Sequence, residues 1–392
     1  MENNTPNTDN FLNWVEIKNF KSIKDLRLDC KRVNVFIGKP NVGKSNILEG
    51  LGLLGASYSD DIEEPVLGDF IRFKNFSNLF YDDDVTLPLK ILSDKVEASV
   101  DFNVSNKTFS YIVGDRLWYS KVAEVLKKGI STRSDDEVHS NKNLFLQFMH
   151  SPAYDFLYLK PDDDRYGGYS HIQVFRFGIN ENGEEVIGLN GDANSPIKRY
   201  EFKSLVDIDE IGSNYLLPPY GRNLFNVIDH NEEVRKDLAE VFRPNGLNLV
   251  LSKKDRKFSV QKQIDGYVYD YPYSNIADTF QRYAFYLAAI ESNTNSVIVL
   301  EEPEVHSFPP YTQELTYRMI YGEENQFFVT THSPYLLQTL IENLTDDQLN
   351  VFITYYENYE TKVRALTADE LREVMDFSID IFYNLEKYQP NV

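Results

Sequence analysis

Residues 38–45 have the types and the spacing needed to bind the phosphates of a nucleotide. Their sequence, Gly-Lys-Pro-Asn-Val-Gly-Lys-Ser, matches G-x-x-x-x-G-K-[ST] at every fixed position. Glycines let successive backbone N–H groups point at the phosphates, Lys44 brings a positive charge to the β- and γ-phosphates, and the Ser45 hydroxyl can ligate Mg²⁺. We predict that the nucleotide is bound by Gly38, Lys39, Pro40, Asn41, Val42, Gly43, Lys44, Ser45 and Asn46.

A second set of candidate residues follows the apolar run Val297–Leu300. Glu301 and Glu302 come directly after this run, a pattern typical of a Walker B strand that ends in carboxylates at the edge of a sheet. We expect Glu301 to act on Mg²⁺, through a water molecule, and Glu302 to take a proton from the attacking water or to orient it. A solvated acid is the alternative interpretation of Glu302.

His332 is the third candidate, and it follows the apolar run Phe327–Thr330. A histidine at this place can reach the γ-phosphate if its strand is the neighbour of the strand that ends at Glu301. It lies 30 positions after Glu302, which leaves room for one helix and one strand. We therefore predict that Glu302 and His332 are the catalytic residues. A histidine that caps a strand without binding a ligand is the alternative.

The elements that would position these residues are a strand and a helix on either side of the loop, and alternating elements in the last third of the chain. Val33–Ile37 predicts a buried strand, and the apolar period after Ser45 predicts a helix to Leu54. Further helices are predicted over 279–290, 311–321 (ended by Gly322) and from Ser333 to Leu340, followed by a hairpin within 351–366 and a helix capped by Thr367 and Glu370. Strands that alternate with helices indicate a mainly parallel sheet.

The domain organisation is less clearly marked. Residues 1–10 are polar and have no apolar leader segment, and we expect residues 1–12 to be disordered. We predict a single domain over residues 13–392, made of two halves at about 13–115 and 215–392 with an insertion at about 116–214. In the first half, alternating apolar residues predict a short antiparallel pair and then a β-meander that ends near Val113.

The charge balance restricts the classes of partner. The chain has 40 Lys and Arg against 61 Asp and Glu, a formal net charge of −21. Broad binding to DNA or to an anionic membrane surface is disfavoured, because such proteins usually carry the opposite sign. Between Lys18 and Leu48, however, eight basic residues face two acids; this is either a solvated strand surface or a phosphate site. The single cysteine, Cys30, and the lack of a membrane-length apolar run predict a cytoplasmic protein with no membrane contact.

Together these motifs resemble the ABC-type P-loop ATPases of the RecF and OLD group. The resembling segments are Ile17–Ile23, Tyr220–Leu224, Glu301–His306 and Thr330–Pro334. The resemblance implies ATP and Mg²⁺ as cofactors. It also implies an α/β fold: an ABC-type ATPase head with a mainly parallel P-loop sheet, an antiparallel β-meander subdomain and a helical or irregular insertion.

The resemblance also implies a contact between subunits. Proteins of this group carry a signature S-x-G-x-x-[RQ] at the start of the helix before Walker B, and it contacts ATP held by a second subunit. The matching residues here are Ala277, Asp278, Thr279 and Arg282. Ala277 and Thr279 depart from the Ser and Gly of that pattern. The implied state is a homo-oligomer, at least a dimer, with ATP sandwiched in its interface.

Three functions follow as hypotheses. The first is an ATPase with slow turnover that senses or drives a separate effector protein such as a nuclease, as in the stand-alone ATPases of the PARIS and Septu anti-phage defence systems, which this chain resembles. The second is a RecF-like DNA-repair ATPase that clamps duplex DNA, so nucleic-acid binding stays open. The third is an ATP-binding scaffold with little turnover.

Overall fold

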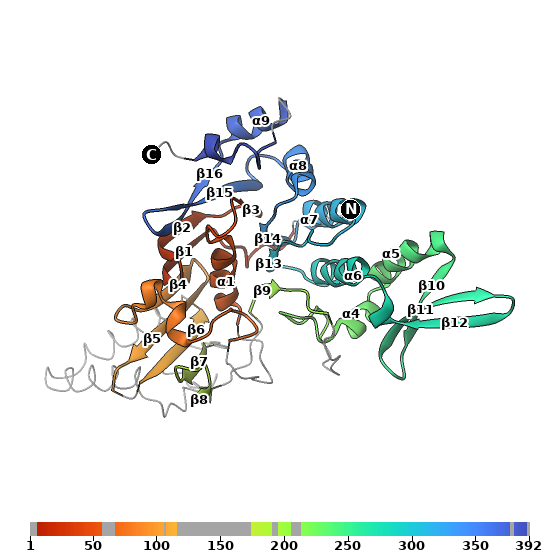
Figure 1. The fold of residues 1–392 in the computed structure, drawn as a ribbon, viewed down its shortest axis with the longest axis horizontal. Coiled ribbons are helices and arrows are strands. Elements are labelled where there is room, and N and C mark those ends of the chain that lie inside the picture. Colours follow the sequence, from red (N-terminus) through yellow and green to blue (C-terminus); the bar gives the residue numbers. More distant parts are fainter. Residues whose placement is uncertain are drawn as a thin grey trace, which may run out of the picture.

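A computed structural model describes residues 6–56, 67–105, 107–115, 174–189, 195–204, 213–376 and 380–389. Figure 1 shows two sheets on either side of the helix that follows the phosphate-binding loop, further helices on the outer face of one sheet, and a small third sheet that protrudes from the body.

The central sheet has six strands in the order β16-β15-β3-β14-β13-β9. Neighbouring strands from β15 to β9 are parallel, and the edge strand β16 is antiparallel. The predicted mainly parallel P-loop sheet is therefore confirmed. Its strands are β3 (Val33–Ile37), β9 (Ile197–Tyr200), β13 (Ser296–Glu301), β14 (Asn325–Thr330), β15 (Leu349–Glu357) and β16 (Glu360–Ala365).

Both faces of this sheet are buried, and successive residues of a strand pack into different cores. Val35 and Val329 belong to the core under α6 (Asp278–Glu291), α7 (Pro309–Tyr321) and α8 (Pro334–Asn343). Phe36 and Phe328 belong to the core shared with α1 (Lys44–Leu54) and the second sheet. Because neither face meets water there, β3, β13 and β14 carry apolar runs, which is the pattern that the sequence displayed.

The helices begin and end close to the predicted residues. The capping box before α9 (Ala368–Asp376) is present: the Thr367 N–H donates to Oε2 of Glu370 at 2.9 Å, and the Glu370 N–H donates to Oγ1 of Thr367 at 3.3 Å. Gly322 does follow α7, but its φ is −75°, so this helix ends without a left-handed residue.

The second sheet is antiparallel, with seven strands in the order β2-β1-β4-β5-β6-β7-β8. It unites the predicted N-terminal pair and the predicted meander. Its strands are β1 (Trp14–Phe20), β2 (Ile23–Asp29), β4 (Leu89–Ser93), β5 (Val96–Asn103), β6 (Thr108–Asp115), β7 (Val174–Ile179) and β8 (Glu185–Leu189). Short 3-10 turns, η1 (Phe76–Leu79) and η2 (Tyr81–Asp83), precede β4.

Two predicted boundaries need correction. The range 116–214, predicted as an insertion, supplies β7 and β8 to the antiparallel sheet and β9 to the central sheet; residues 116–173 lie outside the described part. The predicted disorder of residues 1–12 is wrong for the end of that range. Leu12 is buried and its N–H donates to Oε1 of Gln326 at 2.8 Å, while the Asn10 side chain donates to the Asn295 carbonyl at 2.9 Å.

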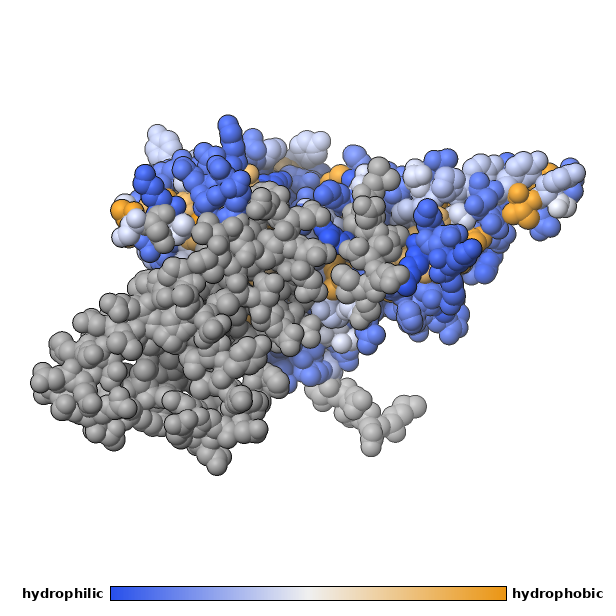
Figure 2. All heavy atoms as spheres, turned by 90° about the horizontal axis from the view of Figure 1, so that it is seen from below, coloured by the Kyte–Doolittle hydropathy of each residue, from blue (hydrophilic) through white to orange (hydrophobic). Residues whose placement is uncertain are grey.

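The third sheet protrudes beyond α4 (Leu224–His230) and α5 (Glu232–Phe242), at the right of Figure 1. It consists of β10 (Leu247–Ser252), β11 (Lys257–Ile264) and β12 (Tyr267–Pro272), followed by the 3-10 turn η5 (Tyr273–Asn275). Every residue of β12 is exposed, and Figure 2 shows a small hydrophobic patch at this end, among coloured residues that are mostly hydrophilic. Within the described ranges, no helix combines the length and the apolar character needed to cross a membrane.

Candidate nucleotide-binding site

The predicted phosphate-binding loop connects β3 to α1 and lies against the β15–β16 hairpin. A Cβ atom added at Gly38 would lie 2.2 Å from the carbonyl oxygen of Thr354, and one added at Gly43 would lie 2.0 Å from Oγ1 of Thr361. Gly43 also has a φ of 97°, which side chains other than glycine rarely adopt. The two glycines of the motif are therefore required by their neighbours as well as by the turn.

Lys44 is almost fully buried inside this loop, with 6% of its surface exposed. Its ammonium donates hydrogen bonds to the carbonyls of Gly38 at 3.0 Å and Lys39 at 2.9 Å. Burial lowers the pKa of Lys44, and the charges of Glu302 and Glu301 oppose that shift. The ammonium at the centre of a loop too tight for Cβ atoms, at the start of a helix, fits a nucleotide's phosphates.

The other loop residues have mixed surroundings. Lys39 pairs with Glu386 of the 3-10 turn η6 (Leu385–Tyr388) at 2.6 Å, and Pro40 and Asn41 are exposed. The Val42 carbonyl accepts a hydrogen bond from Thr361, and the Asn46 amide donates to Oγ of Ser22 at 2.6 Å. The loop is thus fixed from the β15–β16 side, and its outer turn faces solvent.

Ser45 and Glu301, the two predicted metal ligands, are in contact through a side-chain hydrogen bond. Burial raises the pKa of Glu301, but the hydrogen bond from Ser45 and the charges of Arg199 and Arg72 outweigh it and hold that pKa below its ordinary value. Glu301 is therefore ionised at neutral pH. A hydroxyl beside a carboxylate is a suitable donor set for Mg²⁺ next to phosphates, because this ion uses few protein ligands in such sites.

The two arginines on Glu301 were not predicted. Arg199, from β9, is 2% exposed and places Nη2 2.9 Å from Oε2 of Glu301. Arg72 places Nη2 3.2 Å from Oε1 of the same carboxylate and also pairs with the buried Glu49. Neither arginine lies in a recognisable motif. The position of Arg199 on the short strand β9 was the one available signal for this contact.

Glu302 and His332 are brought together by the order of the strands. Oε1 of Glu302 lies 3.3 Å from Nε2 of His332. Glu302 adopts a left-handed φ of 44°, and its N–H donates to the Thr330 carbonyl at 3.1 Å. Burial and the charge of Lys44 lower the pKa of His332 despite the opposing charge of Glu302, so the imidazole is neutral at pH 7.

The signature-like residues lie at the start of α6 and contact the loop after Walker B. Oδ2 of Asp278 lies 2.7 Å from Nε of Arg282 and 3.3 Å from Nδ1 of His306. The Thr279 hydroxyl donates to the His306 carbonyl at 2.7 Å. Ala277 and Thr279 also line an open groove of about 600 Å³ beside β11 and β12.

The basic segment before α1 does not form one free surface. Lys18 and Arg27 pair with Glu16, and other side chains of the segment donate to backbone carbonyls, such as Lys31 to Asp346 at 2.5 Å and Arg32 to Met319 at 2.9 Å. The phosphate interpretation is thus limited to the loop that holds Lys39 and Lys44.

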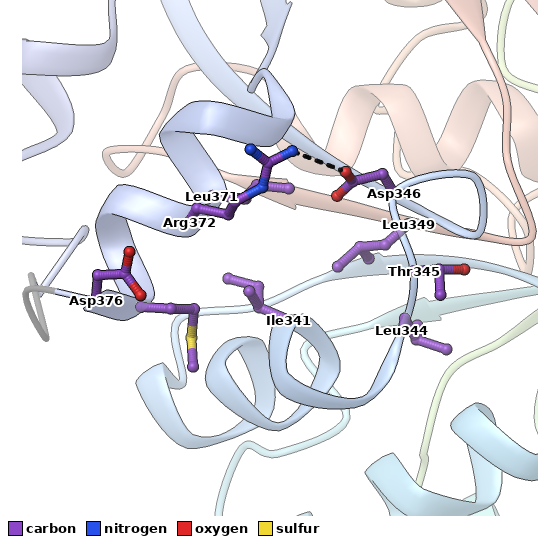
Figure 3. Close-up of a pocket in the computed structure, with 9 residues that line it drawn as sticks. Ile341, Leu344, Thr345, Asp346, Leu349, Leu371, Arg372 and Asp376 are labelled. Atoms are coloured by element: carbon purple, nitrogen blue, oxygen red, sulfur yellow. Dashed lines mark ion pairs between the residues drawn. The ribbon is translucent and has the colours of Figure 1, made fainter.

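A second cavity, between α8 and α9, has a different character (Figure 3). Its volume is about 120 Å³, and its lining includes Leu344, Leu371, Asp346 and Arg372; the last two form an ion pair at 3.5 Å. It is smaller than typical ligand pockets of roughly 300 Å³ or more, and no predicted site residue lines it. Within the described residues, no group of three or more His, Cys, Asp or Glu could hold a metal.

Solved structures of SMC head domains are similar to this chain. One is an SMC head bound to the C-winged helix domain of ScpA, at 12% identity and a TM-score of 0.44, with 92% of this chain and 99% of that chain covered. Another is the SMC head domain from Thermotoga maritima, at 12% identity and a TM-score of 0.37, with coverage of 91% and 99%. The third is an SMC head with an extended coiled coil bound to the C-terminal domain of ScpA derived from Pyrococcus furiosus, at 11% identity and a TM-score of 0.42, with coverage of 94% and 99%. No match was found among curated proteins.

A family model described as "AAA domain, putative AbiEii toxin, Type IV TA system" matches residues 33–338. This range is more than half of the chain and contains the phosphate-binding loop, the Walker B carboxylates and His332. The chain therefore belongs to this family of AAA-domain P-loop ATPases.

Proposed function

We propose that the protein binds MgATP at residues 38–46 and hydrolyses it with Glu302 and His332. The observation that carries the proposal is the convergence of groups from three parallel strands at one sheet edge. Lys44 follows β3, Glu301 ends β13 with Glu302 directly after it, and His332 follows β14. The 3.3 Å contact between Glu302 and His332 completes the arrangement.

The chain's own residues have distinct roles in this proposal. Lys44 and the loop N–H groups bind the β- and γ-phosphates, and Ser45 and Glu301 hold Mg²⁺, which neutralises charge on the phosphates when bound. Glu302 takes a proton from the water that attacks the γ-phosphorus, while the bond to the β-phosphate oxygen breaks and ADP leaves. The neutral His332 keeps Glu302 oriented through Nε2, which lies 3.3 Å from Oε1 of that carboxylate.

The proposal includes a homo-oligomer, at least a dimer, with ATP between copies. The start of α6 supports it, because Thr279 and Arg282 lie in the first turns of a helix, whose N-terminus favours phosphate. Thr279 and Asp278 contact His306 in the loop that follows Glu302. ATP that contacts α6 of a second copy would therefore affect the position of the loop that follows Glu302 in that copy. Isolated copies lack this contact and would hydrolyse ATP slowly.

We further propose that the ATPase senses or drives a separate effector, such as a nuclease, in anti-phage defence. The family's description, which names a putative toxin of a toxin–antitoxin system, supports a role beside a second protein component. The RecF-like alternative, a clamp on duplex DNA, is weakened by the net charge of −21 and by the engaged basic residues.

Two measurements test the core of the proposal: binding of a labelled nucleotide, and the rate of phosphate release from ATP in the presence of Mg²⁺. Lys44→Ala should abolish uptake of a labelled nucleotide, whereas Lys254→Ala, at an exposed lysine outside the loop, should retain it. Glu302→Gln should bind ATP but release phosphate on the order of 10²-fold more slowly. Wild-type protein that binds ATP but is no faster than Glu302→Gln is the scaffold of the third hypothesis.

A further inference from the structure

The direct contact between Glu302 and His332 is not sufficient to hold these residues in place. The two side chains are 35% and 42% exposed, and ion pairs or hydrogen bonds at such exposed positions contribute little against the entropy of the side chains. Each residue also lies in a turn that follows its strand. Another contact must fix the two turns relative to one another if the pair is to keep a reactive geometry.

Glu304 makes that contact. Its Oε1 accepts two hydrogen bonds from the turn after β14, one from Oγ1 of Thr331 and one from the N–H of His332, both at 2.7 Å. Thr331 is fully buried, and its Oγ1 also accepts from the N–H of Ser333 at 2.9 Å. One carboxyl oxygen from the Walker B loop therefore orders the backbone that carries His332.

The same carboxyl group has an unfavourable feature. Its second oxygen, Oε2, is buried and has no hydrogen-bond partner within the described residues. A buried oxygen without a partner destabilises a folded protein, and an apolar side chain of similar size would avoid that cost. The contribution of Glu304 to stability therefore does not explain its presence, whereas the two hydrogen bonds of Oε1 give it a specific place beside the reactive pair.

We propose that Glu304 is a positioning residue: its Oε1 holds the backbone of Thr331 and His332 so that the imidazole faces Glu302. The inference rests on the proposed hydrolysis. Glu304 acts through His332 and affects the chemical step rather than nucleotide binding. Its role needs an acceptor oxygen, which a glutamine also provides.

Two substitutions at Glu304 and a double variant test the inference. Glu304→Met removes the acceptor at similar volume and should lower kcat on the order of 10²-fold, with the Kd for ATP changed by less than about 3-fold. Glu304→Gln keeps the acceptor and should stay within about 3-fold of wild type in kcat. In a His332→Ala background, Glu304→Met should lower kcat no further, because Glu304 acts only by positioning the His332 imidazole. Glu324→Ala, at an exposed position, is the matched control.

Each other outcome has a defined meaning. Unchanged kcat in Glu304→Met, or a full additional loss in the His332→Ala background, overturns the inference while leaving hydrolysis intact. A joint fall of Tm, ATP binding and kcat shows a purely structural role and also overturns it. If Glu304→Met does not fold, Thr331→Val removes one donor and should lower kcat several-fold; no effect overturns the inference. Wild-type protein no faster than Lys44→Ala refutes the proposed hydrolysis as well.

Discussion

Nε2 of His332 lies 3.3 Å from Oε1 of Glu302, because the strands that end beside them are parallel neighbours in which Glu301 pairs with Thr330.

The environment of the His332 imidazole predicts how kcat depends on pH. Burial and the charge of Lys44 lower the pKa of His332 from its ordinary 6.5. The neutral form thus persists below pH 6.5, and kcat should fall only at lower pH, as His332 takes up a proton.

The measurement is kcat against pH at saturating ATP. His332→Gln should abolish the fall of kcat at low pH that protonation of His332 causes. His306→Ala, which replaces a histidine whose side chain is 70% exposed, should keep that fall. If the fall of kcat has its midpoint above pH 6.5, the lowered pKa of His332 is contradicted.

Arg199 is expected to matter more for stability than Arg72, although both contact Glu301. Arg199 is 2% exposed, and its loss leaves Glu301 and Glu201 without this partner. Removing one member of a buried ion pair typically costs about 3–5 kcal/mol. Arg199→Met should therefore lower the free energy of unfolding by about that amount. Arg72→Met, at a side chain 61% exposed, should cost less than Arg199→Met. Its pair with Glu301 is worth about 0–1 kcal/mol, and the buried Glu49 keeps Lys21 as a partner.

Denaturant titration of both variants gives these values, and magnesium-dependent ATP binding gives a second measurement. Arg199→Met removes a cation that competes with Mg²⁺ for the Glu301 carboxylate, so ATP binding by this variant should not need more Mg²⁺ than wild type. Equal losses of stability in the two variants would mean that the burial of Arg199 is not what distinguishes them.

Gly43→Ala is expected to disrupt the loop through steric contact. The new Cβ would lie 2.0 Å from Oγ1 of Thr361, at a φ of 97°. Gly246 provides the matched control: its φ is 68°, but nothing lies within 4 Å of an added Cβ. Gly246→Ala should therefore cost only the backbone strain, about 1–2 kcal/mol, whereas Gly43→Ala should cost more and lose ATP binding. Thr361→Ala should partly rescue Gly43→Ala, and failure of that rescue would assign the effect to the backbone or to Ser22, whose Oγ would lie 2.9 Å from the new Cβ.

The sequence predicted the elements whose signal is local. The apolar runs that became β13 and β14 were recognisable because strands buried on both faces cannot hold polar residues without partners. Their parallel arrangement then places Glu301, Glu302 and His332 at one edge. The capping box at Thr367 was predictable for the same reason, since its partner lies three residues away.

Contacts between distant residues were not predictable. Arg199 lies 102 positions before Glu301, and β9 contains Lys198 and Arg199, residue types that are mostly exposed in proteins. Their burial depends on partners such as Asn293 and Glu301 that no short pattern reveals. The contact of Thr361 with the loop likewise spans 319 positions to Val42.

The proposed dimer predicts that ATP changes the oligomeric state. With Mg²⁺ and ATP, Glu302→Gln should accumulate as a dimer, because slow hydrolysis leaves the nucleotide in place. Thr279→Arg in that background should block the dimer by adding bulk at the start of α6 while ATP still binds. Thr86→Arg, at an exposed threonine far from α6 in the sequence, should have no effect. Light scattering after size exclusion measures the mass, and a dimer that survives Thr279→Arg would exclude α6 from the interface.

Lys198 predicts a separate dependence of stability on pH. Its ammonium lies 2.5 Å from Oδ1 of Asn293, 3.0 Å from Oγ of Ser296 and 3.8 Å above the ring of Tyr215. Burial lowers the pKa of Lys198 to about 8. Below pH 8 the lysine is charged in both states, so the folded protein bears the full cost of a buried charge. Between about 8 and 10.5 the folded state loses the proton while the unfolded state keeps it, so stability rises with pH. Relative to Lys198→Met, the wild type should therefore gain in free energy of unfolding as pH increases from 7 to 10. A difference that stays constant over this range would show that Lys198 keeps its ordinary pKa in the folded protein.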